Sequence, residues 1–437
     1  MFSDSRPCAF FRTYRGRFPA LAIESGARLR FPRSRPLLAS ARPPNAVSLT
    51  PWRFALPGML SHVDPDGLLE YSVVYTDRAL NHMSQSFQSV MKDISSTLKR
   101  VYNAEAAVVV PGSGTFGMEA VARQYATGQS CMVIRNGWFS YRWTQILEMG
   151  EIAESEIVLK AQRVGEGAQA PFAPAPIDTV VEAIRRERPG VVFAPHVETS
   201  AGIILPDAYL RAVADAVHAV GGLFVLDCIA SGTIWVDMEK CGADVVVSAP
   251  QKGWSGTPCC GLVMLSPHGL ERLGETKSTS FACDLGKWHQ IMEAYENDGH
   301  AYHTTMPTDG LRAFAETMRE TESVGLDVIK ARQQELGDRI RTLLEGRGFP
   351  SVAADGFKAP GVVVSYTGDP GIKSGAKFAA AGVQIAGGVP LQCDEGDDFS
   401  TFRIGLFGLD KLNDVESAVE TFTKALDRVR PESTEVG

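Results

Sequence analysis

Short apolar runs alternate with amphipathic stretches from about residue 95 to residue 265. Continuous apolar strands separated by helices of period 3.6 are typical of a mostly parallel sheet covered by helices on both faces. The strands are expected at 106–110, 131–134, 157–159, 191–194, 223–226, 245–247 and 261–265. The helices are expected at 117–125, 177–185 and 208–220. The pattern predicts an α/β fold with a seven-stranded sheet, in which ligands bind beyond the carboxyl ends of strands.

The pattern changes after about residue 325. A long charged helix is expected at 328–345, followed by strands at 361–366 and 401–406 and a final helix at 411–428. A chain of 437 residues is too long for one small core. We therefore predict a large domain at 56–325, which includes an N-terminal segment, and a small α+β C-terminal domain at 326–437.

The first part of the chain differs in composition from the rest. Residues 1–50 contain nine Arg, no Lys and two acids, a net charge of +7, whereas the whole chain carries −8. Such a composition is typical of a transit peptide, but the prolines at 32–36 and 43–44 fit poorly in an amphipathic helix. A misplaced start, with Met59 as the true one, is the alternative. Either way, we predict that residues 1–55 are a disordered or non-native extension.

Composition and cysteine spacing limit the partners and the compartment. The net charge of −8 argues against a nucleic-acid partner, and no apolar run is long enough to span a membrane. The cysteines form no Cys-x-x-Cys pair and no Cys/His cluster, so no metal site is predicted. We expect free thiols in a reducing, cytoplasmic compartment. The eight cysteines are Cys8, Cys131, Cys228, Cys241, Cys259, Cys260, Cys283 and Cys393.

A glycine-rich turn joins the first expected strand to the next helix. It reads Gly112-Ser113-Gly114-Thr115. Glycines let the backbone approach a phosphate, and a helix N-terminus offers free N–H groups and a positive dipole end. Ser113 and Thr115 add hydroxyl donors. The turn is typical of a phosphate cradle or, equally, of a plain loop.

Two further strand ends carry chemically active side chains. Asp227 follows the run 223–226, where it is either a ligand group or a helix cap. Lys252 follows the run 245–247, where it is either a surface lysine or a buried nucleophile with a depressed pKa. Together with the cradle, these residues match the needs of pyridoxal phosphate (PLP): Asp227 pairs with the pyridine nitrogen and Lys252 forms the Schiff base.

Seven segments resemble, in order, the class-V aminotransferases of PLP fold type I, and most nearly their alanine–glyoxylate and serine–pyruvate group. The resemblance extends from about residue 80 to the C-terminus. The matching segments are Ser113-Gly114-Thr115, Asn136-Gly137-Trp138-Phe139, the stretch from His196 to Gly202, Asp227 with Ser231, Gln251-Lys252, the stretch from Ala301 to Pro307, and the stretch from Phe402 to Gly405.

The resemblance implies specific roles around the cofactor. Ser113, Gly114 and Thr115 would bind its phosphate. Phe139 would stack on the pyridine ring; Trp138 is the rival, and core packing is the commoner use of either aromatic side chain. The same motifs imply four further cofactor-binding residues. They are Thr199, which would bind by its hydroxyl group, Asp227, Gln251 and Lys252.

The resemblance also implies a homodimer with shared active sites. Tyr302 and Thr305 would bind the phosphate of the neighbouring subunit's cofactor. Arg403 would hold the substrate carboxylate, for which a guanidinium fork is better suited than an ammonium group. Without the resemblance, Arg403 on a strand would more often form a surface ion pair.

The segments that flank the substrate in this family depart from its pattern. No Gly-Pro-rich segment occurs at 62–71, and the segment 385–395 also differs. The acids Asp64, Asp66, Asp394 and Glu395 either favour a donor with a second polar group or are solvated loop charges.

Transamination is the leading hypothesis for the reaction, from a small alanine- or serine-like amino acid to a 2-oxo acid such as glyoxylate or pyruvate. Lys252 would act as general base and acid. The first alternative is a PLP-dependent lyase or cysteine desulfurase on the same fold, for which Cys393 would supply the nucleophile. The second alternative is a non-catalytic regulatory protein. The presence of Lys252, Asp227 and Arg403 together argues against it.

Overall fold

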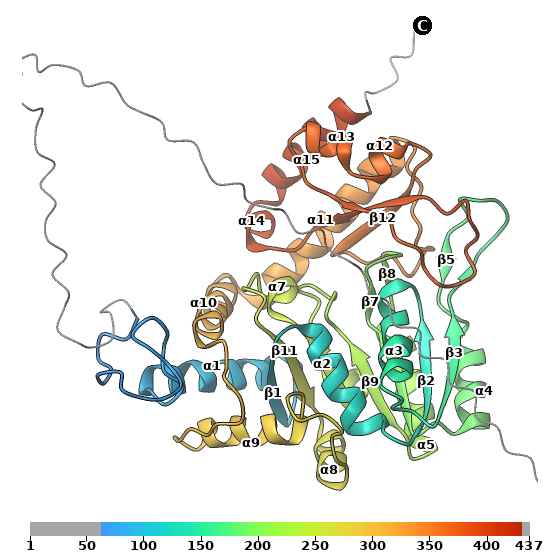
Figure 1. Cartoon of the computed structure of the whole chain (residues 1–437). Coiled ribbons are helices and arrows are strands. Elements are labelled where there is room, and N and C mark those ends of the chain that lie inside the picture. Colours follow the sequence, from blue (N-terminus) through green and yellow to red (C-terminus); the bar gives the residue numbers. More distant parts are fainter. Residues whose placement is uncertain (1–62, 431–437) are drawn as a thin grey trace, which may run out of the picture. The chain divides into compact units, whose positions relative to one another are not determined.

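The computed structural model describes residues 63–430. The predicted extension at 1–55, the alternative start Met59 and Cys8 lie outside the described residues. The chain from residue 63 onward is built around one large sheet, followed by a smaller sheet with its own helices (Figure 1).

The large sheet has seven strands, as predicted, and its strand order is β1-β11-β10-β9-β6-β2-β3. The run β10-β9-β6-β2-β3 is parallel, whereas β11 is antiparallel to both of its neighbours. The central strands are buried along their whole length, which explains their continuous apolar runs. The strands are β1 (Ala106–Pro111), β2 (Ser130–Arg135), β3 (Ser155–Lys160), β6 (Val191–Pro195), β9 (Leu223–Asp227), β10 (Val245–Ser248) and β11 (Cys260–Leu265).

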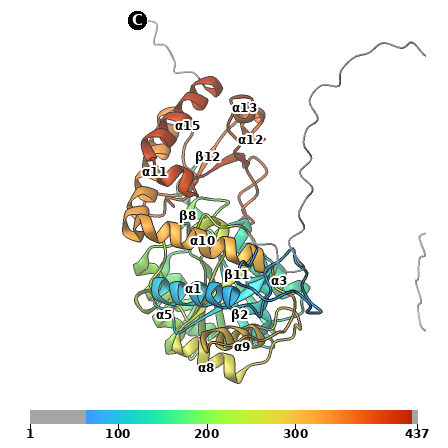
Figure 2. The same cartoon turned by 90° about the vertical axis from the view of Figure 1, so that its left-hand side faces the viewer.

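Helices cover both faces of this sheet: α3 and α5 lie on opposite sides of it (Figure 2). Helix α3 packs on β2 and β6, α5 on β9, α2 on β11 and β10, and α1 and α9 on β1. The helices of this part are α1 (Gln85–Tyr102), α2 (Gly114–Val121), α3 (Trp138–Met149), α4 (Ile177–Glu187), α5 (Asp207–Ala219), α6 (Met238–Cys241), α7 (Pro250–Gly253), α8 (Pro267–Glu275), α9 (Leu285–Glu296) and α10 (Thr308–Val324).

The helix predicted at 117–125 differs from the observed one. Helix α2 begins at Gly114, inside the glycine-rich turn, and its last residue is followed by a π-helical turn at Ala122–Ala126. The turn and the helix N-terminus are therefore one structure, which places the first N–H groups of α2 at the carboxyl end of β1.

The chain after α10 forms a three-stranded antiparallel sheet of order β12-β14-β13. Gly325 joins α10 to α11 with a φ of +98°, a conformation that favours glycine. The division into domains at residue 325 stays a prediction. The elements are α11 (Leu326–Gly346), β12 (Val362–Tyr366), α12 (Pro370–Lys373), α13 (Ala376–Ala380), β13 (Ala386–Gly387), β14 (Thr401–Gly405), α14 (Leu409–Leu412) and α15 (Val415–Val429).

The prediction of one final helix at 411–428 is wrong. Helix α14 ends at Leu412 and α15 begins at Val415. Asp414 caps α15, because its side chain accepts a hydrogen bond of 2.9 Å from the amide of Ser417. An aspartate within the apolar pattern therefore marks a new helix start.

Two short hairpins complete the structure. They are β4 (Gln162–Arg163) with β5 (Phe172–Ala173), and β7 (Val197–Glu198) with β8 (Ile203–Ile204). No helix within residues 63–430 combines the length and the apolar character needed to cross a bilayer.

Candidate active site

Asp227 and Lys252 meet at the carboxyl edge of the large sheet. Asp227 is the last residue of β9, and its partner in the parallel neighbour β10 is Val247. The chain leaves β10 and enters the short helix α7, which carries Lys252. Parallel strands bring both residues to the same edge, where ligands of α/β proteins bind.

Burial changes the protonation of both groups. It raises the pKa of the Asp227 carboxyl to about 6, against the opposing effects of the Ile229 amide and the Lys252 charge. Burial lowers the pKa of the Lys252 amine, while the charges of Asp227 and Glu198 oppose that change. A lysine with a lowered pKa holds more of its neutral, nucleophilic form near neutral pH.

Phe139 lies next to Lys252. The Nζ of Lys252 is 6.0 Å from the centroid of the Phe139 ring. The guanidinium carbons of Arg142 and Arg403 lie 5.3 and 5.6 Å from the same centroid. Trp138 instead packs against Tyr141, with ring centroids 5.8 Å apart. The geometry therefore favours Phe139 over Trp138 as the stacking ring.

The predicted phosphate cradle forms the start of α2. Gly112 has a φ of +124°, and Ser113 is the extended N-cap residue whose side chain makes no capping hydrogen bond. A Cβ on Gly114 would collide with Ile229, so the turn approaches the segment after Asp227 closely. Arg142 donates a hydrogen bond of 3.0 Å to Thr115 Oγ1. A guanidinium beside a helix N-terminus suits an anion.

Glu198 is a fully buried carboxylate that sequence reasoning left without a role. It accepts hydrogen bonds from the amides of Phe139 and Ser140 at 3.2 and 2.9 Å. It also accepts hydrogen bonds from the hydroxyls of Ser140 and Ser200, both at 2.7 Å. Glu198 thus caps α3 and fixes the residue that faces Lys252. A Cβ on Gly137 would collide with Ser200 Oγ, which explains the glycine there.

Thr199 and Gln251 are half-buried neighbours of Glu198 and Lys252 in the chain. Neither side chain has a hydrogen-bond partner within residues 63–430, so both are open to a ligand. Ser231, predicted as part of the Asp227 motif, instead contacts His196 across the sheet edge, with Oγ and Nδ1 2.7 Å apart.

Arg403 lies on β14 and reaches the same site. Its Nε donates a hydrogen bond of 2.8 Å to the carbonyl of Gly387. Within the described part of the chain, no hydrogen bond or ion pair occupies its two outer nitrogens, which remain available for a carboxylate. Phe407 follows β14, and its ring centroid lies 5.8 Å from Lys252 Nζ. The residues of β14 and beyond therefore close the site over Lys252.

Tyr302 and Thr305 lie in the segment between α9 and α10. Their hydroxyl oxygens are 3.2 Å apart, and the Tyr302 ring packs against His82 at 5.5 Å. Among residues 63–430, neither side chain makes a hydrogen bond or a ring contact with Lys252 of the same chain.

Cys393 does not have the surroundings of a mobile nucleophile. Its side chain is buried, its thiol donates to the carbonyl of Arg135, and burial raises its pKa to about 12. The neighbouring acids have local partners: Asp394 pairs with Lys160 at 2.8 Å, and Glu395 accepts hydrogen bonds from three backbone amides of its own loop. These two acids are therefore loop charges in this structure.

The arrangement fits PLP. It combines a half-buried lysine with a lowered pKa, a buried acid, a flanking aromatic ring and a helix N-terminus whose Ser113 hydroxyl has no capping partner. When bound, the cofactor supplies the electron sink that makes the α-proton of an amino acid acidic.

The fold and the site define an α/β protein of PLP fold type I. The family model named aminotransferase class-V matches residues 68–364, and the chain belongs to this family. By that membership it is a PLP-dependent aminotransferase.

Relatives of the chain span most of its length. A 2-aminoethylphosphonate–pyruvate transaminase of Paraburkholderia xenovorans is 28% identical over 81% of this chain and 90% of its own. A protein named soluble hydrogenase, small subunit, of Synechococcus sp. is 27% identical over 65% of this chain and 71% of its own. The crystal structure of an alanine–glyoxylate aminotransferase of Nostoc sp. has a TM-score of 0.67 and 21% identity, covering 80% of this chain and 88% of that one. That structure agrees with the fold.

Proposed function

We propose that this aminotransferase moves the amino group of a small, alanine- or serine-like amino acid to a 2-oxo acid such as glyoxylate or pyruvate. The observation that carries the proposal is the convergence of Lys252, Phe139 and Arg403, with Lys252 Nζ and the Arg403 guanidinium both within 6.0 Å of one ring centroid. This spacing is suited to a small molecule with one carboxylate. Relatives named for pyruvate and glyoxylate as acceptors support the choice of oxo acid.

Each residue of the site has a chemical task in this proposal. Arg403 binds the carboxylate of the donor and then that of the acceptor. The Lys252 amine, once free, removes the α-proton of the donor and delivers it within the same site, so it acts as base and then as acid. Asp227 keeps the pyridine nitrogen protonated. Arg142 and the first turn of α2 hold the phosphate.

The same proposal includes a homodimer with shared sites. The segment 68–73 exposes apolar side chains: Leu68 is 89% exposed, Tyr71 80% and Val73 103%. The chain continues from this segment to Tyr75, which donates a hydrogen bond to the carbonyl of Met306. An exposed apolar segment of this kind suits a subunit interface.

Mixing two inactive variants tests the shared sites. One variant is Lys252→Ala, and the other is Tyr302→Phe with Thr305→Ala, both assayed at limiting PLP. If Tyr302 serves the partner's site, each mixed dimer regains one intact site, and activity recovers to about a quarter of wild type. No recovery after confirmed subunit exchange contradicts sharing.

A cytoplasmic location is also part of the proposal. All seven cysteines of the described residues are free thiols, which suits a reducing compartment.

A panel of donors and acceptors tests the proposed substrates. Alanine, serine, aspartate and 2-aminoethylphosphonate are each paired with glyoxylate and with pyruvate, and kcat/KM is measured for every pair. We expect the highest value for alanine or serine. A preference for aspartate or 2-aminoethylphosphonate would contradict the proposed donor but leave transamination intact.

A further inference from the structure

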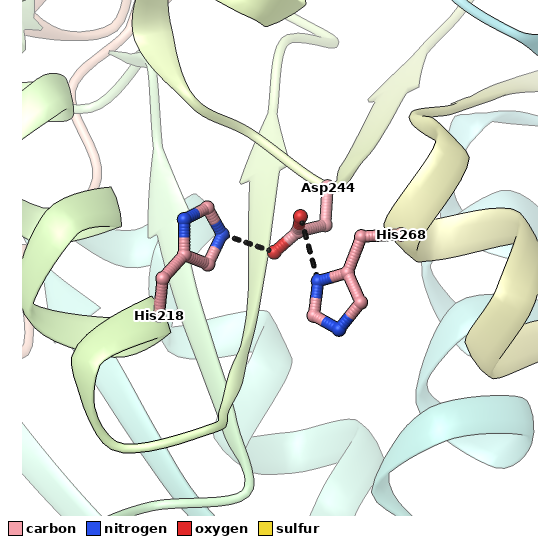
Figure 3. A group of neighbouring side chains, drawn as sticks. All are labelled: His218, Asp244 and His268. Carbon is pink, nitrogen blue, oxygen red and sulfur yellow. Dashed lines mark hydrogen bonds and ion pairs between the residues drawn. The ribbon is translucent and has the colours of Figure 1, made fainter.

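A second cluster of ionisable side chains lies at the opposite edge of the large sheet. Asp244 immediately precedes β10, whereas Lys252 follows the carboxyl end of the same strand. His218 comes from the last turn of α5, and His268 from the first turn of α8. Figure 3 shows the two imidazoles on either side of the carboxylate.

The cluster is compact and partly open to solvent. His218 Nε2 lies 2.9 Å from Asp244 Oδ2, and His268 Nδ1 lies 3.1 Å from Asp244 Oδ1. All three ligand atoms lie within 4.8 Å of one another. The Asp244 side chain is 4% exposed, whereas those of His218 and His268 are 36% and 40% exposed. Water and small ions can therefore reach the imidazoles while the carboxylate stays fixed.

We propose that His218, Asp244 and His268 bind a divalent transition metal of the zinc type. Two imidazoles and one carboxylate are a common zinc ligand set. Bonds of about 2.0–2.1 Å in tetrahedral geometry place ligand atoms about 3.3 Å apart. The two imidazole nitrogens lie 2.9 and 3.1 Å from different oxygens of the carboxylate. With one ligand atom per residue, the three atoms lie within 4.8 Å of one another, so the partly exposed imidazoles need only a small movement to reach this spacing. Water fills the remaining position.

The surroundings hold the carboxylate in place. The amide of Phe224 donates to Asp244 Oδ2 at 2.8 Å, and the hydroxyl of Ser266 donates to Oδ1 at 3.4 Å. Partners of this kind orient a metal ligand. The ion would join α5, β10 and α8, and it would stabilise the fold rather than take part in catalysis.

The sequence pattern did not predict a metal site formed by His218, Asp244 and His268. His218 and His268 lie 26 and 24 residues from Asp244, and no spacing rule for metal sites covers such distances. The prediction of no metal site rested on cysteine and Cys/His patterns, and only the fold brings these three residues together.

Zinc binding by the full-length, PLP-loaded protein tests the proposal. After treatment with a chelator and its removal, the protein is titrated with Zn²⁺ by calorimetry and with Co²⁺ by visible absorption. The double variant His218→Gln/His268→Gln is compared with wild type. His289→Gln is the matched control, because His289 contacts Glu293 on α9 and lies outside the cluster.

We expect wild type and His289→Gln to bind one more equivalent of Zn²⁺ per chain than the double variant. A hundredfold excess of Zn²⁺ over Kd should raise their Tm by about 3–5 °C and leave the Tm of the double variant unchanged. The single variant His268→Gln, at a partly exposed position, replaces the double variant if the latter does not fold. Equal stoichiometry, affinity and Tm shift in wild type and variant would overturn the proposal and leave a metal-free hydrogen-bonded cluster.

Discussion

Glu198 holds Phe139 in place: the Glu198 carboxylate lies 3.2 Å from the Phe139 amide nitrogen. The carboxylate is fully buried and accepts from both backbone and hydroxyl donors at the start of α3. The ring that faces Lys252 is thus positioned by a residue from a different strand end.

Replacing Glu198 with Gln should therefore weaken both the fold and cofactor binding. The amide NH₂ would face backbone N–H donors, so we expect a loss of about 1–3 kcal/mol in the free energy of unfolding of the apoprotein. We also expect an about tenfold higher Kd for PLP, measured by fluorescence titration. Glu187→Gln, an exposed carboxylate on α4, should change neither quantity. Normal PLP affinity in Glu198→Gln would show that Glu198 is merely structural.

The seven strands and the three strand-end motifs followed from the sequence, because apolar runs and turn residues are local signals. The role of Glu198 and the positions of Arg142 and Phe407 did not, because they depend on contacts between distant segments. The prediction of a single final helix failed because the cap at Asp414 was read as part of an amphipathic pattern.

The raised pKa of Asp227 predicts a pH-dependent stability of the apoprotein. Burial disfavours the charged carboxylate, so its cost appears as pH rises from the ordinary value of 3.8 towards about 6 and stays constant above that. Asp227→Asn removes a cost of about 3 kcal/mol. The apo variant should therefore gain Tm relative to apo wild type, with a gain that grows from pH 5 to pH 7.

The same substitution should reduce turnover. An amide cannot keep the pyridine nitrogen protonated, and we expect kcat to fall by about two orders of magnitude or more. In the stability measurement, a gain in Tm of apo Asp227→Asn over apo wild type that is equal at pH 5 and pH 8 would contradict the raised pKa of Asp227.

Arg403→Lys tests carboxylate recognition. An ammonium cannot donate to the Gly387 carbonyl and also offer a planar fork, so KM for the donor should rise about 10–100-fold while kcat changes little. Arg339→Lys, at a half-buried ion-pair residue on α11, is the control and should leave both constants unchanged. A fall in kcat at constant KM would assign Arg403 a different task.

Cys393→Ser separates transamination from desulfuration. The thiol is buried and its pKa is raised to about 12, so almost none of it is thiolate near neutral pH. Transaminase turnover should stay within about twofold of wild type, because the hydroxyl can keep the hydrogen bond to the Arg135 carbonyl. Loss of turnover with PLP still bound would favour the desulfurase alternative.

We propose that Lys252 both carries the cofactor and moves the α-proton. The most direct measurement adds alanine or serine, without an oxo acid, to PLP-loaded wild type and to Lys252→Ala while the visible spectrum is recorded. We expect wild type to lose the absorption of its lysine-bound cofactor and to release one oxo acid per chain, whereas Lys252→Ala should release none. Oxo acid release by Lys252→Ala at the wild-type rate, or catalytic release of ammonia by wild type without cofactor conversion, would contradict it.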